Sequence, residues 1–168
     1  MPNHCVNKLR LGKLTPELIS DITRNSNICQ VMRPMPKDIA NTTVGSRGLD
    51  SSDPLGWYGW AHQNWGTKWG AYATYIEEQG EDFIVLKFET AWSPPIKFYE
   101  YLEEQGYDAH AFYVEQGCDF IGIYDAGEDY VLDLSPLVKE YEEELEPAIE
   151  RFVKEYTVFT MDYIHAGG

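Results

Sequence analysis

Features that mark membrane, exported and metal-binding proteins are scarce in this sequence. No apolar run approaches the roughly 18 residues that a membrane-spanning helix needs. The opening residues, MPNHCVNKLRLGK, lack the apolar core of a signal peptide. The three cysteines, Cys5, Cys29 and Cys118, form no CxxC pair and no Cys/His ligand spacing. We therefore expect a soluble cytoplasmic protein that has buried thiols, makes no membrane contact and carries no metal or other cofactor.

Motifs of common enzyme classes are also missing. The sequence has no Walker loop, no GxGxxG, no GxSxG and no HExxH. The four histidines are widely scattered, at His4, His62, His110 and His165. A pair such as Cys5 with His110 would act together only if the fold joined them. The sequence therefore marks no catalytic residue and favours a binding protein over an enzyme.

Positive charge is nearly absent from the second part of the chain, while the net charge is −15. Residues 1–99 hold ten Lys/Arg and ten Asp/Glu, whereas residues 100–155 hold three Lys/Arg and seventeen Asp/Glu. Such a surface repels nucleic-acid phosphates and anionic membranes, and it attracts basic proteins. We expect a basic protein as the partner and no direct contact with nucleic acid.

Apolar residues, in contrast, are plentiful enough for a folded core. They make up 43% of the 168 residues, with 14% aromatic, which suits one domain or one core with an appendage. The string EQG ends a periodic segment three times, at Gly80, Gly106 and Gly117. The first and third glycines are typical of hairpin turns, and Gly106 of a helix end that follows Ser93 as cap and Pro94 in the first turn. Residues 72–125 are therefore predicted to run strand, strand, helix, strand, strand.

The flanking segments complete a fold class. HCVNKLRL predicts an opening strand, and TPELISDITRNS predicts a helix with Thr15 as its cap. Residues 41–56 are rich in Ser, Thr, Gly and Asp and predict a long exposed loop. Together these elements predict, for residues 1–133, an α+β ferredoxin-like sandwich, in which an antiparallel sheet carries its helices on one face.

Residues 134–168 predict a C-terminal acidic amphipathic helix, kinked or broken near Pro147. An apolar stripe runs from Leu134 to Tyr156 at helical spacing. The opposite face holds the candidate partner-binding residues Glu140, Glu142, Glu143, Glu144, Glu146 and Glu150. Such a face either binds a basic partner or only keeps the protein in solution.

The segment NWGTKW places two tryptophans around one glycine and one lysine. Each tryptophan buries about 150 to 250 Å² when packed, so the segment is either a plug in the core or the wall of a cleft. Gly66 allows close backbone approach, and Lys68 lies among aromatic rings. The candidate ligand-binding residues are therefore Trp65, Lys68, Trp69 and Trp92.

A second polar cluster follows residue 124. Its carboxylates are Asp125, Glu128, Asp129 and Asp133. Their spacing is not that of an EF-hand loop, so a solvated turn is favoured over a site for a hard cation.

Four strings, in order along the chain, carry a resemblance to a known family. They are MPNHCVNKL at 1–9, MRPMP at 32–36, NWGTKW at 64–69 and TAWSPP at 90–95. Together they resemble the landmarks of the Api-like or YubB-like family of phage- and plasmid-borne proteins. The resemblance implies a ferredoxin-like domain on a mobile genetic element and no known catalytic residues.

Charge and resemblance together lead to a functional expectation. We expect a non-enzymatic accessory protein that binds and inhibits a host defence or nucleic-acid-handling protein through its acidic surface. The alternative is a protein that binds, or an enzyme that converts, a small anionic, nucleotide-like ligand in the Trp-rich cleft.

Overall fold

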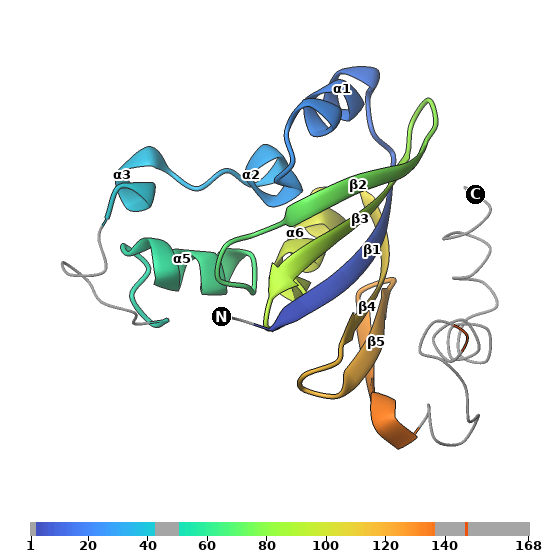
Figure 1. The fold of residues 1–168 in the computed structure, drawn as a ribbon. Helices are drawn as coiled ribbons and strands as arrows, with labels where there is room; N and C mark the ends of the chain where they lie inside the picture. The colour runs from blue at the N-terminus through green and yellow to red at the C-terminus, as the bar shows by residue number, and fades with distance from the viewer. Residues whose placement is uncertain (1–2, 43–50, 137–146, 148–168) are drawn as a thin grey trace.

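The computed structural model describes residues 3–42, 51–136 and 147, and this part is an α+β fold with one six-stranded antiparallel sheet. The strands are β1 (His4–Gly12), β2 (Tyr72–Gln79), β3 (Ile84–Ala91), β4 (Asp108–Glu115), β5 (Phe120–Asp125) and β6 (Glu128–Asp133). The helices are α1 (Pro16–Arg24), α2 (Ile28–Met32), α3 (Lys37–Ala40), α5 (Trp57–Asn64) and α6 (Ile96–Glu104). Figure 1 shows their arrangement around the sheet.

The strand order is β2-β3-β1-β4-β5-β6, and every neighbouring pair is antiparallel. β1 is a central strand, since Leu9 pairs with Leu86 of β3 on one side and with Ala111 of β4 on the other. Its alternation of apolar and polar residues suits a strand with two different faces. The predicted order of strand, strand, helix, strand and strand over residues 72–125 is confirmed.

The ends of two helices were predicted from cap residues, with different outcomes. The Thr15 hydroxyl accepts a hydrogen bond from the amide of Leu18 at 3.2 Å, so the predicted cap of α1 is confirmed. The predicted cap of α6 is wrong. That helix starts after Pro95 without a side-chain cap, and the Ser93 hydroxyl instead donates to the Gly66 carbonyl at 3.1 Å.

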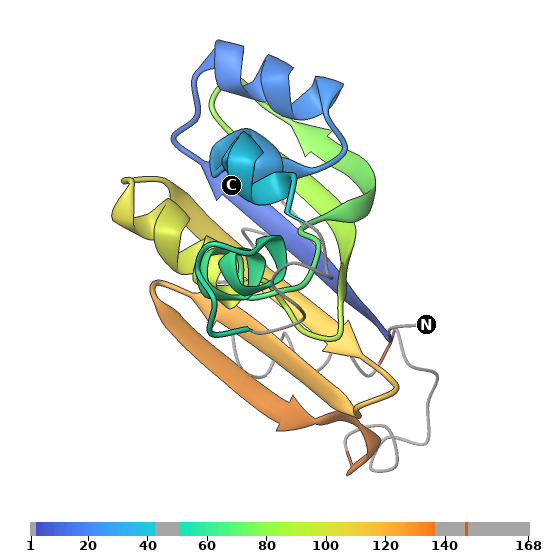
Figure 2. The same ribbon diagram turned by 90° about the vertical axis from the view of Figure 1, so that its left-hand side faces the viewer.

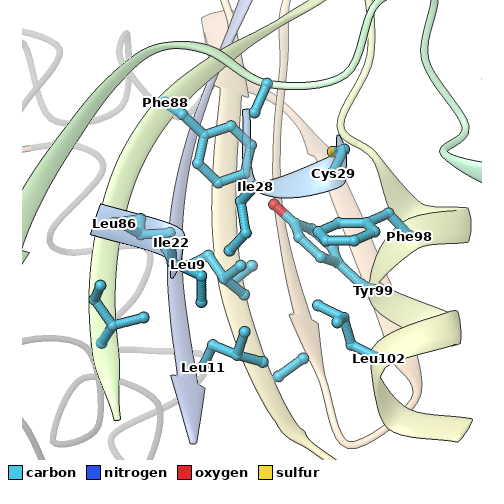
Figure 3. Close-up of a cluster of buried hydrophobic side chains, with 14 of the residues drawn as sticks. Leu9, Leu11, Ile22, Ile28, Cys29, Leu86, Phe88, Phe98, Tyr99 and Leu102 are labelled. Carbon is cyan, nitrogen blue, oxygen red and sulfur yellow. The ribbon is translucent and has the colours of Figure 1, made fainter. Parts of the chain in front are cut away.

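The main core lies between one face of the sheet and the helices (Figure 3). The strands β1 and β3 and the helices α1, α2 and α6 contribute buried side chains to it, namely Leu9, Leu11, Ile19, Ile22, Ile28, Leu86, Phe88, Phe98 and Leu102. Among its polar groups, the Tyr99 hydroxyl donates to Asn7 Oδ1 at 3.4 Å and Asn7 Nδ2 donates to the Thr90 hydroxyl at 2.9 Å, whereas the buried Tyr124 hydroxyl has no hydrogen-bond partner in the described part of the chain. The helices α1, α2, α5 and α6 therefore share one face of the sheet (Figure 2).

The opposite face of the sheet carries a smaller apolar cluster. Its buried residues are Val114, Ile121, Ile123 and Leu134. Lys8 of β1 and Glu77 of β2 form an ion pair at 2.7 Å on this face, and His110 Nδ1 lies 2.5 Å from Asp125 Oδ1. The sheet thus has two unlike faces, and the helices cover the more apolar one.

Two predictions about small features need correction. Cys5 and Cys29 are buried free thiols, as predicted, but Cys118 is exposed because it lies in the turn between β4 and β5. The carboxylates predicted to share one turn do not share it. Asp125 ends β5, and the other three lie on β6, a strand that was not predicted, so only Asp125 and Glu128 flank the two-residue turn.

Some predicted segments fall outside the described residues. These are residues 43–50 of the predicted loop and nearly all of the predicted extension, including its six glutamates, so both stay predictions. The described remainder of the loop, residues 51–56, consists of turns and bends. The short helices α2, α3 and α5 were not predicted. Within the described ranges, no helix has the length and apolar character needed to span a membrane.

Candidate functional site

The segment from α5 to Gly70 contains the NWGTKW string, and its first tryptophan belongs to the core. Trp65 is 3% exposed, its indole N–H donates to the Arg33 carbonyl at 3.0 Å, and its ring meets Trp60 edge-on at 5.2 Å. A buried indole with its polar atom paired is a stabilising plug. Trp65 therefore matches the first alternative for the string, the plug in the core.

Gly66 turns the chain directly after this plug. Its φ is +80°, and a Cβ at this position would lie 3.1 Å from the backbone nitrogen of Lys97. The Trp65 carbonyl accepts a hydrogen bond from the amide of Phe98 at 3.3 Å. Only glycine adopts the left-handed conformation without strain and also allows this close approach. The string is therefore held against the start of α6.

Beyond the turn, aromatic side chains reach the surface near the beginning of β1. The Lys68 ammonium lies 4.4 Å from the Trp69 ring centroid, and Trp69 is 43% exposed. Trp69 in turn contacts the Tyr72 ring at 6.5 Å, and the Tyr72 hydroxyl lies 2.8 Å from His4 Nδ1. With Trp92, which follows the residue paired to His4, these side chains form what we call the aromatic surface.

Trp92 has an uncommon backbone conformation for a bulky residue. Its φ is +70° and its side chain is 48% exposed. The amide of Trp92 donates to the Asn3 carbonyl at 2.9 Å, which ties the left-handed turn to the start of β1. Such a conformation costs free energy for a residue with a large side chain, and here it holds a large ring in solvent.

A groove of about 430 Å³ opens between the helices α5 and α6 and the strands β4 to β6. We call it the β6 groove, and it is lined by His62, Gly66, Ser93, Pro94, Ile96, Lys97, Tyr113, Phe120, Asp129 and Val131. The Tyr113 hydroxyl donates to Asp129 Oδ1 at 2.5 Å. Burial raises the pKa of Asp129 more than this hydrogen bond lowers it. The groove thus combines apolar walls with a carboxylate whose pKa lies above its ordinary value.

His62 forms part of the opposite wall of the groove. Its ring meets Tyr58 at 4.4 Å, and its Nε2 atom is buried without a hydrogen-bond partner in the described part of the chain. Burial lowers the pKa of His62, and the charge of Lys68 lowers it further. The imidazole is therefore harder to protonate than that of an exposed histidine.

The strands beyond β1 are strongly acidic. Residues 100–136, which we call the acidic half, contain no Lys or Arg. Their carboxylates are Glu100, Glu103, Glu104, Asp108, Glu115, Asp119, Asp125, Glu128, Asp129 and Asp133. Glu104, Glu128 and Asp133 are exposed. Among the residues that the structure describes, no three His, Cys, Asp or Glu side chains are grouped to hold a metal ion.

Comparisons with family models, with curated proteins and with solved structures gave no match. The functional assignment therefore depends on the surfaces of the molecule itself.

The structure separates the four predicted ligand-binding residues. Trp65 is inside, while Trp69 and Trp92 are exposed and Lys68 stacks on Trp69. A ligand-binding role for these residues stays a prediction. The β6 groove was not predicted, because its walls come from five elements far apart in the sequence.

Proposed function

We propose that this protein is a non-enzymatic binding protein that holds a basic partner protein against its acidic half. The observation that carries the proposal is the absence of Lys and Arg from residues 100–136, which hold ten carboxylates. These residues form α6 and the strands β4 to β6, so the charge is concentrated on one part of the sheet. A potential of one sign speeds the encounter with a basic protein and repels acidic competitors.

The ferredoxin-like assignment of the sheet and its helices is also a proposal. We propose that β1 to β4, with α1 and α6, are a ferredoxin-like unit to which β5 and β6 are added. Two observations support it: the chain order strand, helix, strand, strand, helix, strand, and the spatial order β4-β1-β3-β2. On this view the acidic half comprises the last helix and strand of that unit together with the added β5 and β6.

The resemblance to phage- and plasmid-borne proteins supports a biological setting. We propose that the protein acts in the cytoplasm of a bacterial host and inhibits a defence protein or a nucleic-acid-handling protein. Such targets hold DNA or RNA on basic surfaces, and a dense array of carboxylates competes for those surfaces. The six glutamates from Glu140 to Glu150 belong to the same proposal.

Affinity capture with matched charge variants tests the proposal. Three proteins are immobilised and exposed to bacterial lysate: the wild-type chain, the triple variant Glu104→Lys, Glu128→Lys, Asp133→Lys, and a variant in which the six glutamates from Glu140 to Glu150 are changed to Lys. The wild type is expected to retain basic nucleic-acid-binding proteins, and raised salt should release them because the Debye length is about 8 Å at physiological ionic strength and shorter above it.

Each reversal is expected to reduce this retention, and added DNA should compete with it. Retention of the same proteins by wild type and both variants, at low and high salt alike, would show that acidic charge is not the means of binding. Circular dichroism of the variants provides the folding control.

A second candidate function is favoured by the aromatic surface. Two tryptophans are 43% and 48% exposed, and a lysine stacks on the first of them, which suits a planar anionic ligand. We propose titration with adenosine monophosphate, followed by tryptophan fluorescence, with Lys68→Ala and Trp92→Ala as variants. Quenching that saturates in the wild type and weakens in both variants supports this candidate; equal, non-saturating quenching in all three removes it.

A further inference from the structure

β6 is an edge strand whose outer side is open within the described ranges. The sheet order ends at β6, and Figure 2 shows it (orange) beyond the helices, with no coloured element on its far side. Its pairing with β5 is regular over six residue pairs. A regular, open edge presents a row of backbone donors and acceptors that another strand can pair with.

The register identifies the residues whose backbone groups point outward. The amide of Leu134 donates to the Asp119 carbonyl at 2.9 Å, so these two residues form a hydrogen-bonded pair. In an antiparallel ladder such pairs alternate with pairs that are not hydrogen-bonded. Asp129, Val131 and Asp133 are therefore not bonded to β5, and their N–H and C=O groups face the open edge.

The other edge of the sheet is different. β2 changes register against β3 between Tyr72 and Tyr75 and again between Ile76 and Glu78, and Ala73 has a φ of +49°. Such bulges bend an edge strand and hinder the addition of another strand. Of the two edges, β6 is the one whose geometry permits further pairing.

The side chains next to this edge define what an added strand would meet. Asp129 and Val131 line the β6 groove, and Val131 is 52% exposed. Side chains on neighbouring strands share a face when their residues are paired. An added strand would therefore place alternate side chains beside Asp129, Val131 and Asp133.

The charges select the kind of strand. Two copies of β6 would bring their own carboxylates together, because three of the six residues from Glu128 to Asp133 are acidic, namely Glu128, Asp129 and Asp133, and none is basic. Like charges opposite one another destabilise a strand pair, and opposite charges stabilise it. A basic strand is therefore preferred over a second copy of this chain.

We propose that β6 takes an extended basic segment of the partner protein as a seventh strand, with Lys or Arg beside Asp129 and Asp133 and an apolar side chain beside Val131 in the β6 groove. The inference rests on the proposed function, which supplies a basic partner, and it adds the binding mode and the sequence pattern. That pattern is cation, any residue, apolar, any residue, cation. It reads the same in both directions, so it suits parallel and antiparallel addition.

Synthetic peptides test the binding mode without knowledge of the natural partner. The probe is a fluorescein-labelled TKTVTKT peptide, and the controls are the same composition in the order TKKTTVT and a TKTVTKT peptide methylated on alternate backbone nitrogens. Anisotropy titrations at low salt are expected to show binding of the first peptide and about tenfold weaker binding of both controls, because only the first keeps the alternation and the free N–H groups.

Protein variants test the same contact from the other side. Val131→Pro removes one outward N–H and leaves the pairing with β5 intact, and Val131→Thr is the control that keeps it. Val131→Pro and Asp133→Lys should each weaken binding about tenfold, whereas Glu104→Lys, a reversal on α6, should have a much smaller effect. In amide exchange by NMR, Asp129, Val131 and Asp133 should gain protection on peptide binding.

The outcomes separate this inference from the proposed function. Equal binding of TKTVTKT and TKKTTVT, or equal losses in Asp133→Lys and Glu104→Lys, would overturn strand addition and leave a basic partner held by diffuse charge. Failure of both cationic peptides to bind at low salt would count against the proposed function as well. Val131→Pro is interpreted only if its circular dichroism matches that of Val131→Thr, and the methylated peptide decides the matter on the wild-type protein.

Discussion

Replacement of Trp65 by alanine is the most direct measure of how the NWGTKW string stabilises the fold. Trp65 is 3% exposed, and a buried tryptophan removes about 150 to 250 Å² from water. At about 25 cal/mol per Å² this burial is worth about 4 to 6 kcal/mol, in line with the roughly 3 to 5 kcal/mol lost in Trp→Ala substitutions. The Arg33 carbonyl also loses its donor. We therefore expect Trp65→Ala to lower the free energy of unfolding by about 4 kcal/mol.

Trp69→Ala is the matched control, since it removes the same side chain four residues away. Trp69 is 43% exposed, so by the same arithmetic its replacement should cost only about 2 to 3 kcal/mol. In a chain of this size each kcal/mol shifts the melting temperature by about 2 to 4 °C, which gives a fall of about 8 to 16 °C for Trp65→Ala. Lys68→Ala should change the melting temperature little. A Trp65→Ala protein with the melting temperature of the wild type, or a larger fall in melting temperature for Trp69→Ala than for Trp65→Ala, would refute the assignment of Trp65 to the core.

Three further predictions concern single residues. In urea titrations Gly66→Ala should lower the free energy of unfolding more than Gly106→Ala does. Both positions have positive φ, but only at Gly66 would a Cβ press against the Lys97 nitrogen. Equal losses would show that this close contact does not affect stability. Because burial holds the pKa of His62 below 6.5, the unfolded chain binds a proton that the native state does not, so stability is full above that pH and falls as pH drops below it. His62→Asn should reduce this fall between about pH 7 and pH 5, and an unchanged fall would contradict it. In native protein a thiol reagent should modify Cys118 alone, while all three cysteines react in urea; three fast thiols without urea would contradict the burial of the other two.

The parts of the fold that were predicted correctly carry local signals. The opening strand alternates apolar and polar residues, α1 starts at a threonine followed by proline, and the three EQG strings each end an element. Each of these patterns fixes structure within a few residues. The strand and helix order over residues 72–125 followed from them.

The elements that were missed lack such signals. α5, with the sequence WYGWAHQN, follows Gly56, which provides no side-chain cap, and three of its first four residues are aromatic. β6, with the sequence EDYVLD, has charged residues at both ends because it lies at an edge and most of its side chains are exposed. Strand propensity and the periodic pattern of apolar residues are clear only when an element buries one side. The sequences of α5 and β6 could therefore not be distinguished from a loop.

The burial of the individual candidate-site residues could not be predicted, for a different reason. Trp65 and Trp69 are four residues apart in one string, yet one is buried and the other exposed, because Gly66 turns the chain between them. A turn cancels the periodicity from which burial is inferred. The β6 groove depends on the approach of α5 and α6 to β4, β5 and β6, which no local pattern encodes.

The two candidate binding surfaces meet at one stretch of backbone, and this limits which variants can separate them. Gly66 lines the β6 groove, and two residues later Lys68 and Trp69 belong to the aromatic surface. A change at Gly66 would disturb both surfaces, so it could not show which of them binds the partner or ligand. Trp69 lies outside the groove lining and Asp133 lies on the far edge of the sheet. Loss of peptide binding in Asp133→Lys with nucleotide quenching intact, or the reverse in Trp69→Ala, would therefore assign binding to one surface.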